Sequence, residues 1–208
     1  IQELEYGARL ARLLSAFGRY EEAESEVAAT LERLAAQRAH LPPGSEHQYS
    51  GRLRGTLGLV KLRRGDAKAG LAELRAAARE FDADAEGALP PDSLLSDAFE
   101  LWSDAGLAGL QVEGEKPGPE TVLALERALA ISQRRFEIDP SPGLARELIT
   151  ARINRAGVGL RRGEFDAARE LYLAADRLAA EQVELHPAAL TLRLEWAGVS
   201  NQLGLLAE

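Results

Sequence analysis

The fold of this chain is decided by one stretch, Gly159–Ala168, which reads GLRRGEFDAA. An apolar segment ends in two arginines, a glycine follows, and a glutamate precedes the next apolar segment. Glycine tolerates the left-handed backbone that ends a helix, and cations are favoured at a helix C-terminus. An acidic residue is favoured at the start of the following helix, where the helix dipole is positive. The stretch therefore predicts the tight turn of an antiparallel helical hairpin.

The same pattern occurs at two other places, as KLRRGD at Lys61–Asp66 and more loosely as AFGRYEEA at Ala16–Ala23. Several independent markers then recur at an interval of 47 residues: Gly18 and Gly65, Pro43 and Pro90, Pro140 and Pro187, and Asn154 and Asn201. The interval from Gly65 to Gly163 is 98 residues, and we assign its extra length to the Pro/Gly-rich turn at 114–120. A fixed period of roughly 20–50 residues indicates a repeat architecture.

We expect an all-α fold, because apolar residues recur on helical faces and no segment alternates at period two. Helices are predicted at about 1–17, 20–38, 46–64, 67–84, 93–112, 120–138, 164–185 and 187–208, with one more after an N-cap at Ser141 and a proline at N1. These helices form four antiparallel hairpins and one extra helix, in units of about 1–42, 43–89, 90–139, 140–186 and a partial 187–208. The chain, 1–208, is predicted to be a single right-handed solenoid domain.

The composition excludes several classes of protein. The formal net charge is −8, so attraction to nucleic acid or to an anionic membrane is not expected. No apolar run approaches the length of a membrane span and no signal peptide is visible, so we expect a cytoplasmic protein. Cysteine is absent, which excludes disulfides and thiol chemistry. The chain begins at Ile1 and contains no methionine, so we expect it to be a piece of a larger protein.

The sequence resembles tetratricopeptide (TPR) repeats over essentially its whole length. The matching positions are Gly18, Tyr20 and Ala23 in the first unit, Leu57, Gly58 and Gly65 in the second, Gly163, Phe165 and Ala168 in the fourth, and Leu203 and Gly204 in the last. The third unit departs most: Trp102 and Gly106 fit, but Glu113 or Lys116 stands near the turn glycine. The 47-residue period is longer than the usual period of about 34. It resembles TPR arrays attached to bacterial Ser/Thr kinases or flanking caspase-like proteases.

No motif in the sequence nominates an enzyme, and no cofactor is expected. Phosphate-binding glycine loops, zinc-protease helices, nucleophile elbows and kinase signatures are all absent. His40 and His47 flank Glu46 in one loop, and we interpret them as solvated rather than as metal ligands. Trp102 and Trp196 lie on first helices of units, where burial is expected rather than ligand stacking.

Charge is distributed unevenly over the predicted helices. The segments 46–64 and 142–162 each carry a balance of +4, whereas 92–112 carries −4. In a TPR-like solenoid the first helix of each hairpin lines the concave groove, which would then be basic and suited to an acidic peptide or a terminal carboxylate. The candidate partner-binding residues are Arg12, Arg52, Arg63, Arg152, Asn154, Arg161 and Asn201. Asn154 and Asn201 lie near a repeat position at which many TPR domains use an asparagine to hold the backbone of the ligand. The simpler alternative is that Arg63 and Arg161 only complete helix ends.

Two functional hypotheses follow from the resemblance. The first is a non-catalytic scaffold that binds a segment of a partner protein in the concave groove. The second is a regulatory or sensor domain that packs on the catalytic domain of a larger signalling protein. A weaker third hypothesis is self-assembly through the last helix, where Leu203, Leu205 and Leu206 are apolar.

Overall fold

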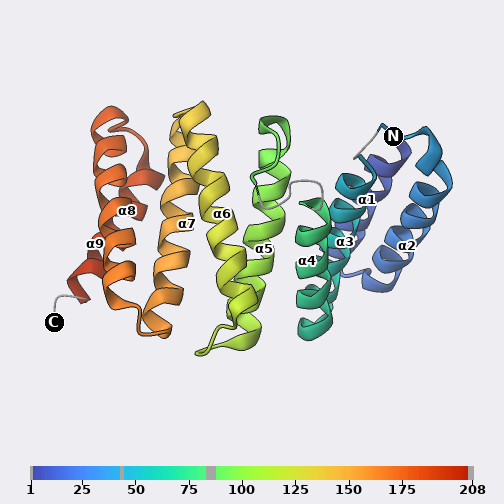
Figure 1. The fold of residues 1–208 in the computed structure, drawn as a ribbon, viewed down its shortest axis with the longest axis horizontal. Coiled ribbons are helices and arrows are strands. Elements are labelled where there is room, and N and C mark those ends of the chain that lie inside the picture. The colour runs from blue at the N-terminus through green and yellow to red at the C-terminus, as the bar shows by residue number, and fades with distance from the viewer. Residues whose placement is uncertain (1, 43–44, 83–87, 206–208) are drawn as a thin grey trace. The chain divides into compact units, whose positions relative to one another are not determined.

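The computed structural model describes residues 2–42, 45–82 and 88–205 of the chain. Within these ranges the regular structure consists of α-helices and short 3₁₀ turns, without a strand (Figure 1). The predicted all-α helical-repeat fold is confirmed. The chain divides into two compact units, Ile1–Val112 and Glu113–Glu208, which are described separately. The predicted single right-handed solenoid concerns the relation between these units and stays a prediction.

The first unit contains α1 (Gln2–Ala16), α2 (Tyr20–Gln37), α3 (Ser45–Arg64), α4 (Ala67–Phe81) and α5 (Leu95–Glu113), whose last residue opens the second unit. α1 packs against α2 and α3, and α3 packs against α4 (Figure 1). The hairpins α1–α2 and α3–α4 therefore form as predicted. The apolar faces of α1, α2 and α3 share a core that includes Leu4, Val27 and Leu53, each nearly inaccessible to solvent.

The second unit contains α6 (Pro119–Ile138), α7 (Pro142–Arg161), α8 (Phe165–Leu185) and α9 (Leu190–Leu205). α7 packs against α6, α8 and α9, and the predicted hairpin α7–α8 is present. Ser141 is the N-cap of α7 and proline follows, as predicted, although the Ser141 hydroxyl caps no backbone N–H. The predicted third hairpin would join the two units and stays a prediction.

Four glycines at turns between consecutive helices adopt positive φ angles, which only glycine adopts readily. They are Gly18 at 75°, Gly65 at 99°, Gly114 at 66° and Gly163 at 77°. The turn glycine of the third unit, near which Glu113 or Lys116 was expected, is Gly114, directly after Glu113. The steps between these glycines are 47, 49 and 49 residues, so the extra length does not lie in the 114–120 turn alone.

The two tryptophans have different environments. Trp102 on α5 is 6% exposed, and its indole N–H donates to Asp82 Oδ2 at 2.8 Å, so the predicted burial is confirmed. Trp196 on α9 is 37% exposed, and the burial predicted for it is wrong. The indole N–H of Trp196 donates to Asp176 Oδ1 at 2.9 Å. This hydrogen bond holds the ring at the surface, because the polar edge of the indole has its partner there.

The last helix is partly covered by its own unit. Leu203 is half-buried and packs against the core that α7 and α8 share. Of the other residues predicted to expose an apolar end, the Leu205 side chain and all of Leu206 lie outside the described part of the structure.

Candidate functional site

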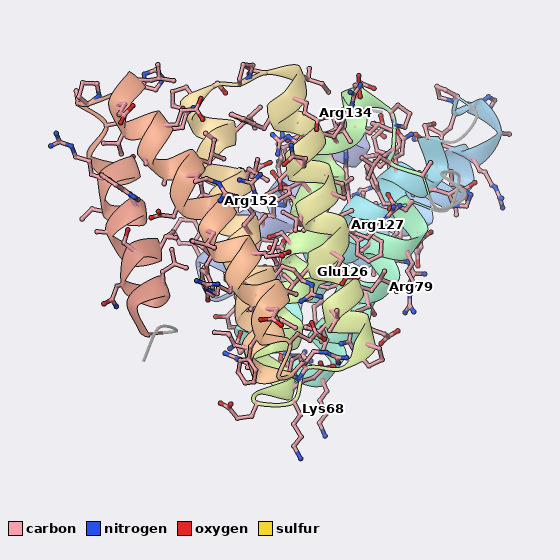
Figure 2. The ribbon with its side chains drawn as sticks, turned by 60° about the vertical axis from the view of Figure 1, so that its left-hand side comes forward. Lys68, Arg79, Glu126, Arg127, Arg134 and Arg152 are labelled. Carbon is pink, nitrogen blue, oxygen red and sulfur yellow. The ribbon has the colours of Figure 1, made fainter. Side chains whose placement is uncertain are left out.

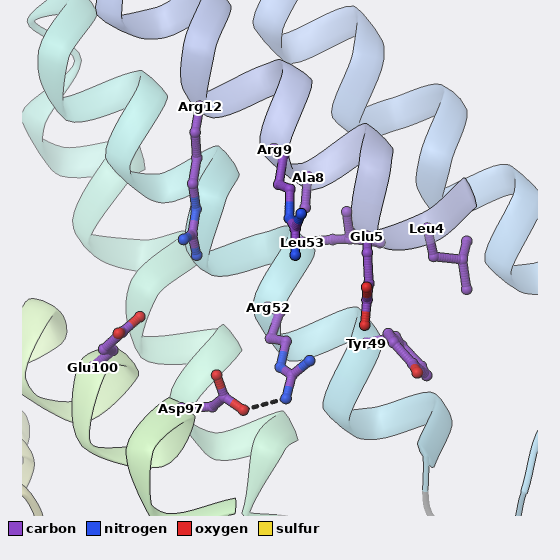
Figure 3. A pocket seen from close by; sticks show the side chains of 10 residues that line it. All are labelled: Leu4, Glu5, Ala8, Arg9, Arg12, Tyr49, Arg52, Leu53, Asp97 and Glu100. Atoms are coloured by element: carbon purple, nitrogen blue, oxygen red, sulfur yellow. Dashed lines mark hydrogen bonds and ion pairs between the residues drawn. The ribbon is translucent and has the colours of Figure 1, made fainter. Parts of the chain in front are cut away.

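A cleft of about 250 Å³ opens in the first unit between α1, α3 and α5, the first helices of three successive predicted repeats (Figure 3). Three helices contribute to its lining: Leu4, Glu5, Ala8, Arg9 and Arg12 from α1, Tyr49, Arg52 and Leu53 from α3, and Asp97 and Glu100 from α5. This cleft is called the α1/α3/α5 groove below. Two of the residues that the sequence nominated for partner binding, Arg12 and Arg52, line it.

Helical periodicity brings the polar side chains of α1 to this surface. Glu5, Arg9 and Arg12 follow one another at spacings of four and three residues, which places them on one face of the helix. The buried residues Leu4 and Ala11 belong to the apolar core that α1 shares with α2 and α3, and Leu4 also lines the groove. α1 is therefore fixed by its apolar side, and its charged side is left to form one wall of the groove.

The arginines of the groove differ in whether an acidic side chain neutralises their charge. Arg52 forms an ion pair with Asp97 of α5, and its guanidinium lies 6.0 Å from the centre of the Tyr49 ring. Arg12 Nε donates to the Thr56 hydroxyl at 3.4 Å. Neither Arg9 nor Arg12 forms an ion pair with any residue that the structure describes. Figure 3 shows both side chains extending from α1 toward α3 and α5.

The acidic helix α5 forms one wall of the groove, and it carries the −4 balance that the sequence assigned to 92–112. Asp97 and Glu100 line the groove, and Asp104 lies further along α5, half-buried. The groove is therefore basic along α1 and acidic along α5, rather than basic throughout. The ion pair with Asp97 accounts for the charge of Arg52, so Arg12 is the stronger candidate of the two for binding a partner.

Asp104 has a perturbed carboxyl group. Burial, together with the charge of Glu100, raises its pKa from 3.8 to about 6, while Arg12 and Arg63 oppose this rise. Because the pKa is higher in the folded state, the folded protein binds the proton more tightly. Stability from this group is complete below about pH 4 and is lost as the pH rises through about 6.

Replacing Asp104 by asparagine should remove the pH dependence of stability that this carboxyl group causes. We expect Asp104→Asn to raise the free energy of unfolding at pH 8 by about 1–3 kcal/mol, since each pKa unit corresponds to about 1.36 kcal/mol. Urea unfolding of both proteins at pH 4 and pH 8 measures the effect. If the difference between them were the same at both values, Asp104 would not titrate as described.

The paired arginines at the hairpin turns do more than place positive charge at the end of their own helix. Their side chains bind residues of helices or turns that come earlier in the chain. Arg63 donates to the Ser15 hydroxyl at 3.4 Å, and Arg64 pairs with Glu24 of α2 at 2.9 Å. In the second unit, Arg161 donates to the Gly114 carbonyl at 2.9 Å and Arg162 to the Pro117 carbonyl at 3.4 Å. Successive helical layers are therefore tied together by the repeated Arg-Arg-Gly segment.

The remaining predicted site residues lie in the second unit and do not join the α1/α3/α5 groove. Arg152 lies between α6 and α8, the second helices of their hairpins, and donates to Gln133 of α6 and to the Ala174 carbonyl of α8. The expectation that it lines a surface of first helices is therefore wrong. Asn154 is half-buried on α7, and Asn201 is exposed on α9.

Sequence reasoning missed five polar or aromatic residues of the groove: Glu5, Arg9, Tyr49, Asp97 and Glu100. Arg9 was detectable, because it precedes Arg12 by three residues and must share its helical face. The acids of α5 are visible in the sequence as a break in the basic pattern. Their pairing with α3 depends on contacts between helices that a single sequence does not specify.

Two features, a metal-binding cluster and a membrane-spanning helix, are absent from the described residues. No group of three histidine or acidic side chains in the described ranges is arranged to hold a metal ion. Within the same ranges, no helix combines the length and the apolar character that crossing a bilayer requires.

The chain has structural but not sequence counterparts among known proteins. No family model and no curated protein matches it. A solved structure from Podosopora anserina, described as a putative kinesin light chain with nearly identical TPR-like repeats, superposes with a TM-score of 0.66 and 19% identity, covering 97% of this chain and 87% of that one. A variant of the same protein superposes with the same TM-score and coverage, at 18% identity. These similarities establish a TPR-like helical-repeat fold.

Proposed function

We propose that this chain is a non-catalytic interaction module that binds a segment of a partner protein in the α1/α3/α5 groove. The observation that carries the proposal is the pair Arg9 and Arg12, two guanidinium groups that line an open cleft and form no ion pair with a described carboxylate, although the charge of Arg12 acts on Asp104. A TPR-like array supports the same function, because stacked helices present a preformed surface and the partner then loses little free energy to rearrangement.

The groove favours a particular kind of partner segment. An acidic side chain or terminal carboxylate would meet Arg9 and Arg12, because arginine binds carboxylates through parallel hydrogen bonds. The opposite wall, with Asp97 and Glu100, would repel an entirely acidic segment. We therefore propose a segment whose negative charge is concentrated on the side that contacts α1.

Charge reversal at Arg12 tests this proposal. Hydrogen bonds to charged groups contribute about 1.5–3 kcal/mol, so Arg12→Glu should weaken binding tenfold or more without unfolding the protein. The measurement is quantitative mass spectrometry of proteins retained on immobilised wild type and variant, followed by titration of the captured partner. Arg52→Glu also breaks the ion pair with Asp97, so Arg12→Glu gives the cleaner result.

Lys68→Glu is the matched control for this experiment. Lys68 is exposed in the first turn of α4 and projects into solvent (Figure 2), and it is not among the residues that line the groove. It carries the same change of charge and should leave binding unchanged. Equal loss of the partner in both variants would mean that net charge, and not the groove, governs binding.

The second hypothesis, a regulatory domain of a larger bacterial signalling protein, places the partner in the same polypeptide. The long repeat period supports it by resemblance to kinase- and protease-associated arrays. The flanking reading frame distinguishes the two hypotheses, because a catalytic signature beside this segment supports regulation in cis. The groove and the Arg12→Glu test are the same in both cases.

A further inference from the structure

A second hollow, of about 560 Å³, lies in the second unit between α6, α7 and α8. Its walls are largely apolar, with Leu129 and Ala130 from α6 and Leu171 and Ala174 from α8. Arg152 of α7 lies within it, half-buried, and Figure 2 shows Arg152 between the ribbons of α6 and α8. This surface, called the α6/α8 hollow, is formed mainly by second helices, and its lining residues all belong to the second unit.

Arg152 has no acidic partner among the described residues. It donates to the Ala174 carbonyl at 2.8 Å and to Gln133 Oε1 at 3.1 Å, which uses two of the five N–H donors of its guanidinium. Burial and the charge of nearby Arg177 lower the pKa of Arg152. Arg155, which lines the same hollow, is instead paired with Glu126 at 2.9 Å and with Glu164 at 3.2 Å.

The repeat supplies an internal comparison for Arg152. Arg54 precedes it by 98 residues, the same interval that separates the turn glycines of the two hairpins. Arg54 Nη1 lies 3.7 Å from Glu73, and its Nε lies 2.9 Å from Glu80, both on the partner helix α4. At the corresponding positions of α8 stand Leu171 and Leu178. The arginine is present in both hairpins, and its two carboxylates are present in only one.

A partly buried charge without a counter-charge is unfavourable, so it marks a place where a bound anion gains affinity. We propose that the α6/α8 hollow binds a segment of a partner protein through one acidic side chain flanked by aliphatic residues. The carboxylate would take the free donors of Arg152, where Glu73 and Glu80 stand beside Arg54 in the first unit. Leu129 and Leu171 would contact the flanking aliphatic side chains.

A pair of short peptides tests the charge directly. The ¹⁵N-labelled protein is titrated with acetyl-Leu-Glu-Leu-amide and with acetyl-Leu-Gln-Leu-amide, while the NMR signals of the arginine N–H groups and of α6 and α8 are followed. The glutamate peptide should bind at least about tenfold more tightly, because only a carboxylate neutralises Arg152. Equal affinity of the two peptides would overturn the proposal. So would sodium acetate binding as tightly as the peptide, since a small anion would then be the ligand.

Restoring the missing acid within the chain provides the second arm. Leu171→Glu recreates the relation of Arg54 to Glu73, so it should abolish glutamate-peptide binding and raise the melting temperature. Leu171→Gln is the matched control, which changes the wall without adding a charge and should retain the preference for glutamate. If Leu171→Glu bound the peptide as wild type does, Arg152 would not be its receptor. Should that variant fail to fold, the two peptides on wild-type protein still decide the question.

Discussion

Ala168→Arg is expected to lower the free energy of unfolding by more than about 3 kcal/mol, because overpacking and an unpaired buried charge act together. Ala168 is 1% exposed at the contact of α8 with α7. A β-carbon built on Gly159 would lie only 3.2 Å from the Ala168 β-carbon, so the two helices leave no room for a larger side chain. Urea unfolding followed by circular dichroism measures the loss.

The neighbouring residue provides the control. Ala167 is exposed on the same turn of α8, so Ala167→Arg should change stability by less than about 0.5 kcal/mol. Both variants introduce the same arginine side chain, and they differ only in the face of α8 on which it lies. Equal stability of the two proteins would show that α8 is rotated from the position described.

Gly70→Ala should also destabilise the protein, by about 1–3 kcal/mol, although alanine normally favours a helix. A β-carbon at Gly70 would lie 2.8 Å from the Gly58 carbonyl oxygen and 2.7 Å from Leu62 Cγ, so α4 and α3 would have to separate. The reciprocal contact is equally tight, since a β-carbon at Gly58 would lie 2.9 Å from the Gly70 carbonyl oxygen. Thermal unfolding monitored by circular dichroism measures the change.

Gly143→Ala is the comparison for Gly70→Ala. Gly143 lies in the first turn of α7, and a β-carbon added there would have nothing within 4 Å, so alanine should be neutral or stabilising by up to about 1 kcal/mol. The double variant Gly58→Ala/Gly70→Ala should cost less than the sum of the single changes, because the helices separate only once. Strict additivity, or a gain of stability at Gly70, would contradict the close crossing of α3 and α4.

The order and limits of the helices were predictable because their signals are local. Gly18, Gly65 and Gly163 carry the positive φ angles that a helix end requires, and arginines or acids flank them. The turn at 114–120 was predicted, but Gly114 was not identified as its turn glycine, because the chain around it is longer and no paired arginines precede it. The residues that lengthen the interval from Gly65 to Gly163 were therefore assigned to the wrong place in the repeat.

Side-chain direction was predicted less well, since one residue of error turns a side chain by about 100° around a helix. Arg152 was expected on a surface of first helices and lies instead between α6 and α8. Arg52 was identified correctly as a charged residue of the groove wall, but its partner Asp97 is 45 residues away. Pairing over that distance depends on how α3 and α5 pack, and neither composition nor periodicity specifies it.

The central claim is that a partner segment contacts the α1/α3/α5 groove, and site-specific photo-crosslinking tests it most directly. Benzoylphenylalanine replaces Tyr49, which lines the groove, or Tyr6, which lies with Leu10 and Arg33 on the α1/α2 face. Both sites are tyrosines of the first unit, so the substitutions are matched. The account predicts that the partner crosslinks to position 49 and not to position 6. Crosslinking at position 6 alone would place the partner on the α1/α2 face and would contradict the groove.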